Sequence, residues 1–209
     1  MANGNDVAVG IVFPAFAIRV AGDHRAELGH AAVLLIQGKS GLTKYFEYGR
    51  YDPANLGLVH TLGVPNVTYG SDGKPTLASL KKCFSDITQQ VARGTGGGHG
   101  DTSIAGIYVD ENAAFGQGLA YATTRQKDNS NAQREPNKIM SNSCLTFMIN
   151  TMEAAGVWMP GNITEAVIGG LAAMAAASIP RVYADIMRLF QSKLDFDAKS
   201  GALSIQGRS

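Results

Sequence analysis

The chain has 209 residues, of which 45% are hydrophobic and 17% are charged, and its formal net charge is +1. This length and composition predict a globular protein with a substantial core and exclude overall disorder. No block of lysine and arginine stands out, so we expect no nucleic-acid partner.

Strand patterns dominate the first third of the chain. They occupy residues 7–13, 15–20, 30–51 and fragments within 57–69. Pro14 separates the first two patterns, while Gly38 and Gly41 mark a turn inside the third. We therefore expect 30–51 to form an antiparallel hairpin.

The rest of the chain is predicted to be mainly helical. The expected helices span 75–93, 111–125, 144–155 and 164–190, the last with a kink at Pro180. Strands are expected at 103–109 and, weakly, at 202–205, and loops at 94–100 and 127–136. Since no internal repeat or linker is evident, the pattern predicts a single α+β domain over 1–209 with a helical C-terminal extension over 157–195.

Two apolar stretches bear on where the protein acts. The stretch at 7–13 follows Asp6 and no basic residue, which is a poor match to a secretory signal and favours a first strand. The stretch at 166–179 is shorter than the roughly 20 residues that a membrane-spanning helix needs. We therefore expect a protein made in the cytoplasm without a signal peptide or stable membrane insertion. Action outside the cytosol would then require a specialised export system.

Cys144 follows three residue types that cap helices well and precedes a helical pattern. The capping run is Ser141, Asn142 and Ser143. A thiol at a helix N-terminus meets the positive end of the helix dipole, which favours the thiolate and predicts a nucleophile. A buried structural cysteine is the alternative interpretation. Cys83 lies inside an amphipathic helix pattern with no nearby glycine or cap, and is expected to be structural. Two cysteines cannot form a disulfide framework; one bridge between them is possible, but a free thiol is the better interpretation of Cys144.

His30 directly follows Gly29 at the start of an apolar strand and is the expected base for this nucleophile. The other histidines fit this role less well. His24 lies in a polar turn and His99 in a glycine-rich loop, which is a poor place for a base that must be held accurately. His60 lies in a strand fragment and stays open as an alternative base.

A third group is expected to orient the imidazole. In the predicted hairpin, the strand after the turn passes beside His30, and Glu47 is the carboxylate inside that strand. A register slip of one residue would turn the opposite face of this strand toward His30, so Tyr48 is the alternative third group. An exposed strand charge is the other explanation of Glu47.

The sequence predicts neither a metal nor a cofactor. The four histidines are scattered and lack the spacing of metal ligands. The glycine-rich segment 94–100 has no lysine followed by serine or threonine, so it does not fit a phosphate-binding loop. A hinge or a lid is the better interpretation of this segment.

Three segments carry a resemblance to a known family, namely 29–35, 45–51 and 142–147. With a histidine strand first and a cysteine helix last, they resemble the circularly permuted NlpC/P60-like, papain-like cysteine hydrolases, which include the lecithin:retinol acyltransferase-like proteins. The resemblance implies an antiparallel sheet packed against a catalytic-cysteine helix, with extra C-terminal helices in this chain. It assigns Cys144 as nucleophile, His30 as base and Glu47 as orienting group. The acyltransferase branch usually has asparagine directly before the cysteine, where this chain has Ser143.

The chain is also similar in kind to antibacterial amidase effectors of type VI secretion systems. This resemblance implies a cysteine-dependent amidase or endopeptidase that cleaves peptidoglycan stem peptides in the periplasm of a target cell. It implies the secretion machinery and a cognate immunity protein as partners. Two alternatives stay open: a lipid acyltransferase or esterase with the same dyad, and a non-enzymatic binding or membrane-active toxin in which Cys144 is incidental.

Overall fold

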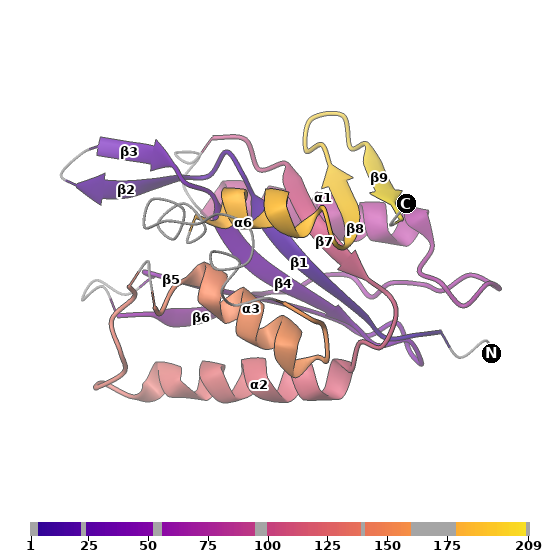
Figure 1. Cartoon of the computed structure of the whole chain (residues 1–209), viewed down its shortest axis with the longest axis horizontal. Helices are drawn as coiled ribbons and strands as arrows, with labels where there is room; N and C mark the ends of the chain where they lie inside the picture. The colour runs from indigo at the N-terminus through magenta and orange to yellow at the C-terminus, as the bar shows by residue number, and fades with distance from the viewer. Residues whose placement is uncertain are drawn as a thin grey trace.

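A seven-stranded sheet forms the centre of the molecule (Figure 1). The computed structural model describes residues 4–21, 24–51, 56–94, 100–138, 141–159 and 179–207. The strands are β1 (Val7–Phe13), β4 (His30–Ile36), β5 (Thr43–Gly49), β6 (Leu58–Leu62), β7 (Ile104–Val109), β8 (Ser192–Phe196) and β9 (Leu203–Gln206). They are ordered β6-β5-β4-β1-β7-β8-β9, and every neighbouring pair is antiparallel. The remaining strands, β2 (Ala17–Ala21) and β3 (His24–Glu27), pair as a separate ribbon.

Helices cover both faces of the sheet (Figure 1). They are α1 (Leu77–Gly94), α2 (Phe115–Lys127), α3 (Cys144–Ala154) and α6 (Pro180–Met187), with a short 3-10 helix at Asp128–Ser130. One apolar core joins α2, α3 and α6 to one face, and a second joins α1 to the other. An α+β fold with an antiparallel sheet is therefore present, as the sequence predicted.

The central strands β1 and β4 are buried along their whole length because both of their faces are covered. Helix α3 approaches β1 closely at Gly10, where a Cβ atom would lie 3.3 Å from the sulfur of Met148. His30 is the first residue of one of these buried strands, and α3, which begins with Cys144, packs against them.

The predicted hairpin over 30–51 is present as β4 and β5. Its turn includes Gly41, whose φ of +71° lies in the left-handed region that glycine adopts without strain. The register pairs Ala32 with Glu47 across the two strands. Since alternate residues share a face, Glu47 lies on the same face of the sheet as His30, two residues before Ala32.

The helix expected at 111–125 begins later than predicted, at Phe115. Asn112 has a φ of +60°, which a right-handed helix cannot accommodate. The Asp6 carboxylate accepts a hydrogen bond of 2.9 Å from the Phe115 backbone N–H, so a distant residue stabilises the first turn of α2.

The C-terminal region differs most from the expectation. Pro180 begins helix α6 instead of kinking a longer helix, because Ile179 before it is extended, as residues before proline prefer to be. Most of the helix expected at 164–190, and with it the apolar stretch at 166–179, lies outside the described residues. The sequence analysis also missed β8, whose Leu194 and Phe196 are buried while its alternate residues are only partly covered. Two strands of the central sheet therefore come from the C-terminal tail.

Candidate active site

Cys144 is the first residue of helix α3, as its capping residues predicted. The hydroxyl of Ser143 accepts a hydrogen bond from the Thr146 backbone N–H, and the Thr146 hydroxyl accepts one of 2.8 Å from the Ser143 N–H. This reciprocal capping box holds the first turn in place and leaves the thiol at the positive end of the helix.

The thiol of Cys144 lies against the start of strand β4. The His30 imidazole and the backbone N–H groups of Ala31 and Leu145 are near enough to the sulfur to lower the pKa of the thiol. The side chain is partly accessible, whereas the only other cysteine, Cys83, is fully buried in the core between α1 and the sheet. Folding therefore brings together two segments that are far apart in the sequence.

His30 is held on several sides at the end of the sheet. Its Nε2 donates a hydrogen bond of 3.1 Å to the Glu47 carboxylate, which leaves Nδ1 as the ring nitrogen available to the sulfur. The rings of Phe13 and Phe16 lie 6.3 Å and 5.1 Å from the imidazole, centre to centre. With only 6% of the residue exposed, the imidazole has little freedom to turn.

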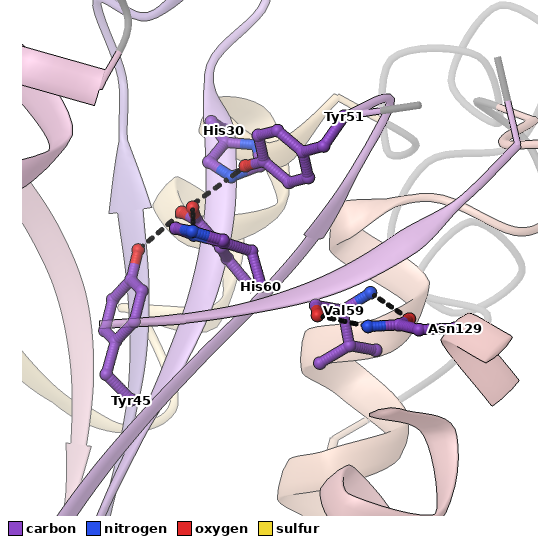
Figure 2. Close-up of polar contacts among 7 residues, drawn as sticks. His30, Tyr45, Tyr51, Val59, His60 and Asn129 are labelled. Atoms are coloured by element: carbon purple, nitrogen blue, oxygen red, sulfur yellow. Dashed lines mark hydrogen bonds and ion pairs between the residues drawn. The ribbon is translucent and has the colours of Figure 1, made fainter. Parts of the chain in front are cut away.

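Glu47 is a buried carboxylate with several hydrogen-bond donors (Figure 2). Besides His30, it accepts a hydrogen bond of 2.6 Å from the Tyr45 hydroxyl and one of 3.0 Å from Nδ1 of His60. The hydroxyl of Tyr51 lies 3.4 Å from Nε2 of His30 at the edge of this group. The carboxylate therefore receives donors from three neighbouring strands or their ends.

Tyr48, the alternative third group, faces the other side of the sheet. Its ring stacks on Phe147 of α3 at 6.0 Å, and the Arg125 guanidinium lies 5.9 Å from its centre. The hydroxyl packs so closely on Gly57 that a Cβ atom there would overlap it. The structure thus brings Glu47, and not Tyr48, to His30.

The remaining histidines take different positions. His60, the alternative base, forms a hydrogen bond with Glu47, and its ring lies tilted against that of Tyr51. His99 lies outside the described residues. Sequence reasoning did not find the contacts of Tyr45 and His60 with Glu47. The alternation of strand residues could have indicated Tyr45, which is two residues from Glu47, but no local signal indicates that His60 pairs directly opposite it.

The charges in the site favour a thiolate beside an imidazolium. Burial by itself would raise the pKa of the Cys144 thiol, but the His30 imidazolium and backbone N–H donors hold it below its ordinary value. Burial would lower the pKa of His30, yet the thiolate and the Glu47 carboxylate raise it to about 10. Hydrogen bonds from both histidines outweigh the effect of burial on Glu47 and hold its pKa well below the usual range.

These shifts predict selective alkylation of Cys144 by iodoacetamide. Burial raises the pKa of Cys83 to about 12, so this thiol stays protonated and covered between pH 6 and 7. We expect Cys144 to react far faster in that range, as measured by mass spectrometry of the labelled peptides. Denatured protein, in which both thiols are exposed, is the control. Equal, slow labelling of both cysteines in folded protein would contradict a stabilised thiolate.

A surface cavity of about 380 Å³ lies between β1, β7 and α6. It has an apolar part that includes Val12 and charged side chains that include Arg181 and Asp185. Val12 pairs with Ala31, the residue that follows His30 on β4, and Val12 and Ala184 belong to the core that α3 shares. The cavity therefore opens on the face of the sheet that α3 covers.

No group of three or more potential metal ligands is found within the part of the chain that the structure describes. Nor does that part contain a helix both long and apolar enough to cross a membrane.

The fold and the site together define an α+β protein in which a thiol at the N-terminus of a helix is paired with a buried imidazole and a buried carboxylate. The model of the family described as "Type VI secretion system effector TseH-like" matches residues 8–157, and the chain belongs to this family. Membership in this family implies that the protein is secreted by a type VI secretion system.

A solved structure supports the same relationship. It is described as the crystal structure of the type VI secretion system effector TseH, and it shares 28% sequence identity with this chain at a TM-score of 0.76. The similarity covers 97% of this chain and 98% of that one. No curated protein matches the chain.

Proposed function

We propose that this effector is a cysteine-dependent amidase or endopeptidase that cleaves peptidoglycan stem peptides in the periplasm of a target cell. The observation that carries the proposal is the placement of Cys144 at the start of α3 against His30, whose Nε2 donates a hydrogen bond to Glu47. A helix-capped thiol with a base and an orienting group is the arrangement of a nucleophilic hydrolase. We further propose that the fold is a circularly permuted NlpC/P60-like, papain-like fold.

The proposed reaction has two steps. In the first, the Cys144 thiolate attacks the peptide carbonyl while backbone N–H groups at the start of α3 stabilise the developing oxyanion. The His30 imidazolium gives its proton to the leaving amine, and the C–N bond breaks. In the second, His30 accepts a proton from water, the resulting hydroxide attacks the thioester, and Cys144 leaves as the thiolate. Glu47 keeps the imidazole oriented and stabilises its positive charge.

Two features support a peptide of the cell wall as the substrate. Membership in a type VI secretion effector family is compatible with a toxin that is delivered into other cells. The cavity between β1, β7 and α6 combines an apolar part with both positive and negative side chains, which suits a peptide with free carboxylate and amino groups. We propose that one flank of the stem peptide binds there. A cognate immunity protein in the producing cell would be the corresponding partner.

Digestion of purified peptidoglycan tests the proposal. We expect the protein to release new free amines from sacculi and to convert the muropeptides into shorter fragments, as detected by liquid chromatography and mass spectrometry. Phospholipid vesicles serve as the parallel substrate. Release of fatty acid from vesicles without any change in the muropeptides would overturn the proposal in favour of lipid chemistry.

Replacing the orienting group should cost less than losing the nucleophile or the base. Glu47→Gln preserves the shape of the side chain but removes the charge that stabilises the imidazolium. In a serine hydrolase, loss of the orienting acid lowers kcat by roughly 10⁴-fold and loss of the nucleophile by roughly 10⁶-fold. We expect the same order here, measured as turnover of muropeptides. Tyr48→Phe is the matched control, and lost activity in it with full activity in Glu47→Gln would contradict the assignment.

A further inference from the structure

The carboxylate of Glu47 is held by two histidines, His30 and His60, which Figure 2 shows close together. On three adjacent strands, Glu47 of β5 pairs with Ala32 of β4 on one side and with His60 of β6 on the other. The two histidines therefore approach the carboxylate from opposite neighbours in the sheet.

The two oxygens of Glu47 have separate partners. Oε2 accepts hydrogen bonds from His30 at 3.1 Å and from the Tyr45 hydroxyl at 2.6 Å, while Oε1 accepts one from His60 at 3.0 Å. Only 5% of Glu47 is exposed, so these donors replace the water that would otherwise solvate the charge. Rotation of the carboxylate would break contacts on both sides, and Oε2 is thereby aimed at His30.

Within the described part of the chain, His60 contacts the site through this carboxylate and the ring of Tyr51. Its ring lies 5.3 Å from that of Tyr51, whose hydroxyl is close to His30, and about half of its side chain is exposed. Tyr45 is fully buried, and burial beside Glu47 raises the pKa of its phenol well above the ordinary value. Tyr45 therefore keeps its proton and stays a donor over the whole working range of the site.

We propose that His60 and Tyr45 are positioning residues that act through Glu47, extending the Cys144–His30–Glu47 triad of the proposed function by two members. They hold Oε2 in line with Nε2 of His30 and keep the carboxylate ionised. Without them the carboxylate stabilises the His30 imidazolium less well. The imidazolium in turn stabilises the Cys144 thiolate less well. Among the described residues, neither side chain forms a hydrogen bond with the sulfur.

Alkylation of Cys144 tests this proposal independently of the substrate. The rate of reaction with iodoacetamide is measured from pH 4 to 9 in full-length wild type, His60→Leu, His60→Gln and Tyr45→Phe. A weaker imidazolium raises the pKa of the thiol, so we expect the acid limb of the rate profile to move to higher pH in His60→Leu and Tyr45→Phe. His60→Gln, whose amide can still donate to Oε1, should retain most of the wild-type profile.

Turnover of muropeptides provides the second readout. We expect His60→Leu and Tyr45→Phe to lower kcat about tenfold while KM changes less than twofold, because neither residue touches the peptide. Tyr48→Phe, on the opposite face of β5, is the matched control. Circular dichroism melting identifies any variant that fails to fold. If His60→Leu fails to fold, Tyr45→Phe, which removes a single hydroxyl, still tests the proposal.

The outcomes separate this proposal from the proposed function. An unchanged acid limb in both folded variants, His60→Leu and Tyr45→Phe, would overturn the positioning role. A shifted acid limb together with intact peptidoglycan would support the positioning role and contradict the proposed substrate.

Discussion

Cys144→Ala and His30→Ala are each expected to abolish hydrolysis of peptidoglycan peptides while leaving the protein folded. The sulfur of Cys144 forms the covalent bond to the substrate, and His30 transfers the proton in both steps of the proposed reaction. Loss of either member of such a pair commonly costs roughly 10⁶-fold in kcat. Turnover of muropeptides by the purified variants, with circular dichroism to verify folding, measures this effect.

The second cysteine offers a control for this experiment. Cys83 is buried in the core between α1 and the sheet, and the charged group that acts on its thiol is Asp86 of the same helix, so Cys83→Ala removes a thiol that has no described interaction with Cys144 or His30. We expect activity close to that of the wild type. Folded Cys144→Ala protein with full activity would contradict the role of this thiol as the nucleophile.

The compartment in which the protein is produced should decide its toxicity. Peptidoglycan is accessible from the periplasm and not from the cytoplasm, so we expect lysis when the protein is exported to the periplasm of a bacterium. The same protein retained in the cytoplasm should be tolerated. Growth curves and microscopy of induced cultures measure the difference.

Periplasmic Cys144→Ala is the matched control for toxicity and should be harmless. Toxicity that persists in this variant would favour a membrane-active toxin that does not depend on the thiol. Equal toxicity of the wild type in both compartments would contradict a cell-wall substrate, because the cytoplasm offers no access to it.

Local sequence patterns determined the elements that carry the site. The hairpin over 30–51 follows from two apolar stretches and a turn with glycines, and Gly41 does adopt a positive φ. The start of α3 at Cys144 follows from the capping residues before it, of which Ser143 forms the cap. These features depend on neighbours within a few residues, so the local sequence is enough to predict them.

The site itself depended on contacts that no local pattern encodes. The choice between Glu47 and Tyr48 rests on a register of one residue, which the pairing of Ala32 with Glu47 decides. The donation from His60 to Glu47 requires β6 to add to the sheet in one particular register. Likewise, β8 joins β7 because its buried face completes the core, although its sequence is polar at alternate positions.

The sequence by itself therefore determined which side chains could act and on which elements they lie. Only the tertiary structure decided which of them meet, since packing of α3 on the sheet places the Cys144 thiol against His30 from a distant part of the chain. Strand register and helix packing are set by the summed burial of many side chains over the whole core. No short segment contains that sum, which is why the residues could be named in advance but their geometry could not.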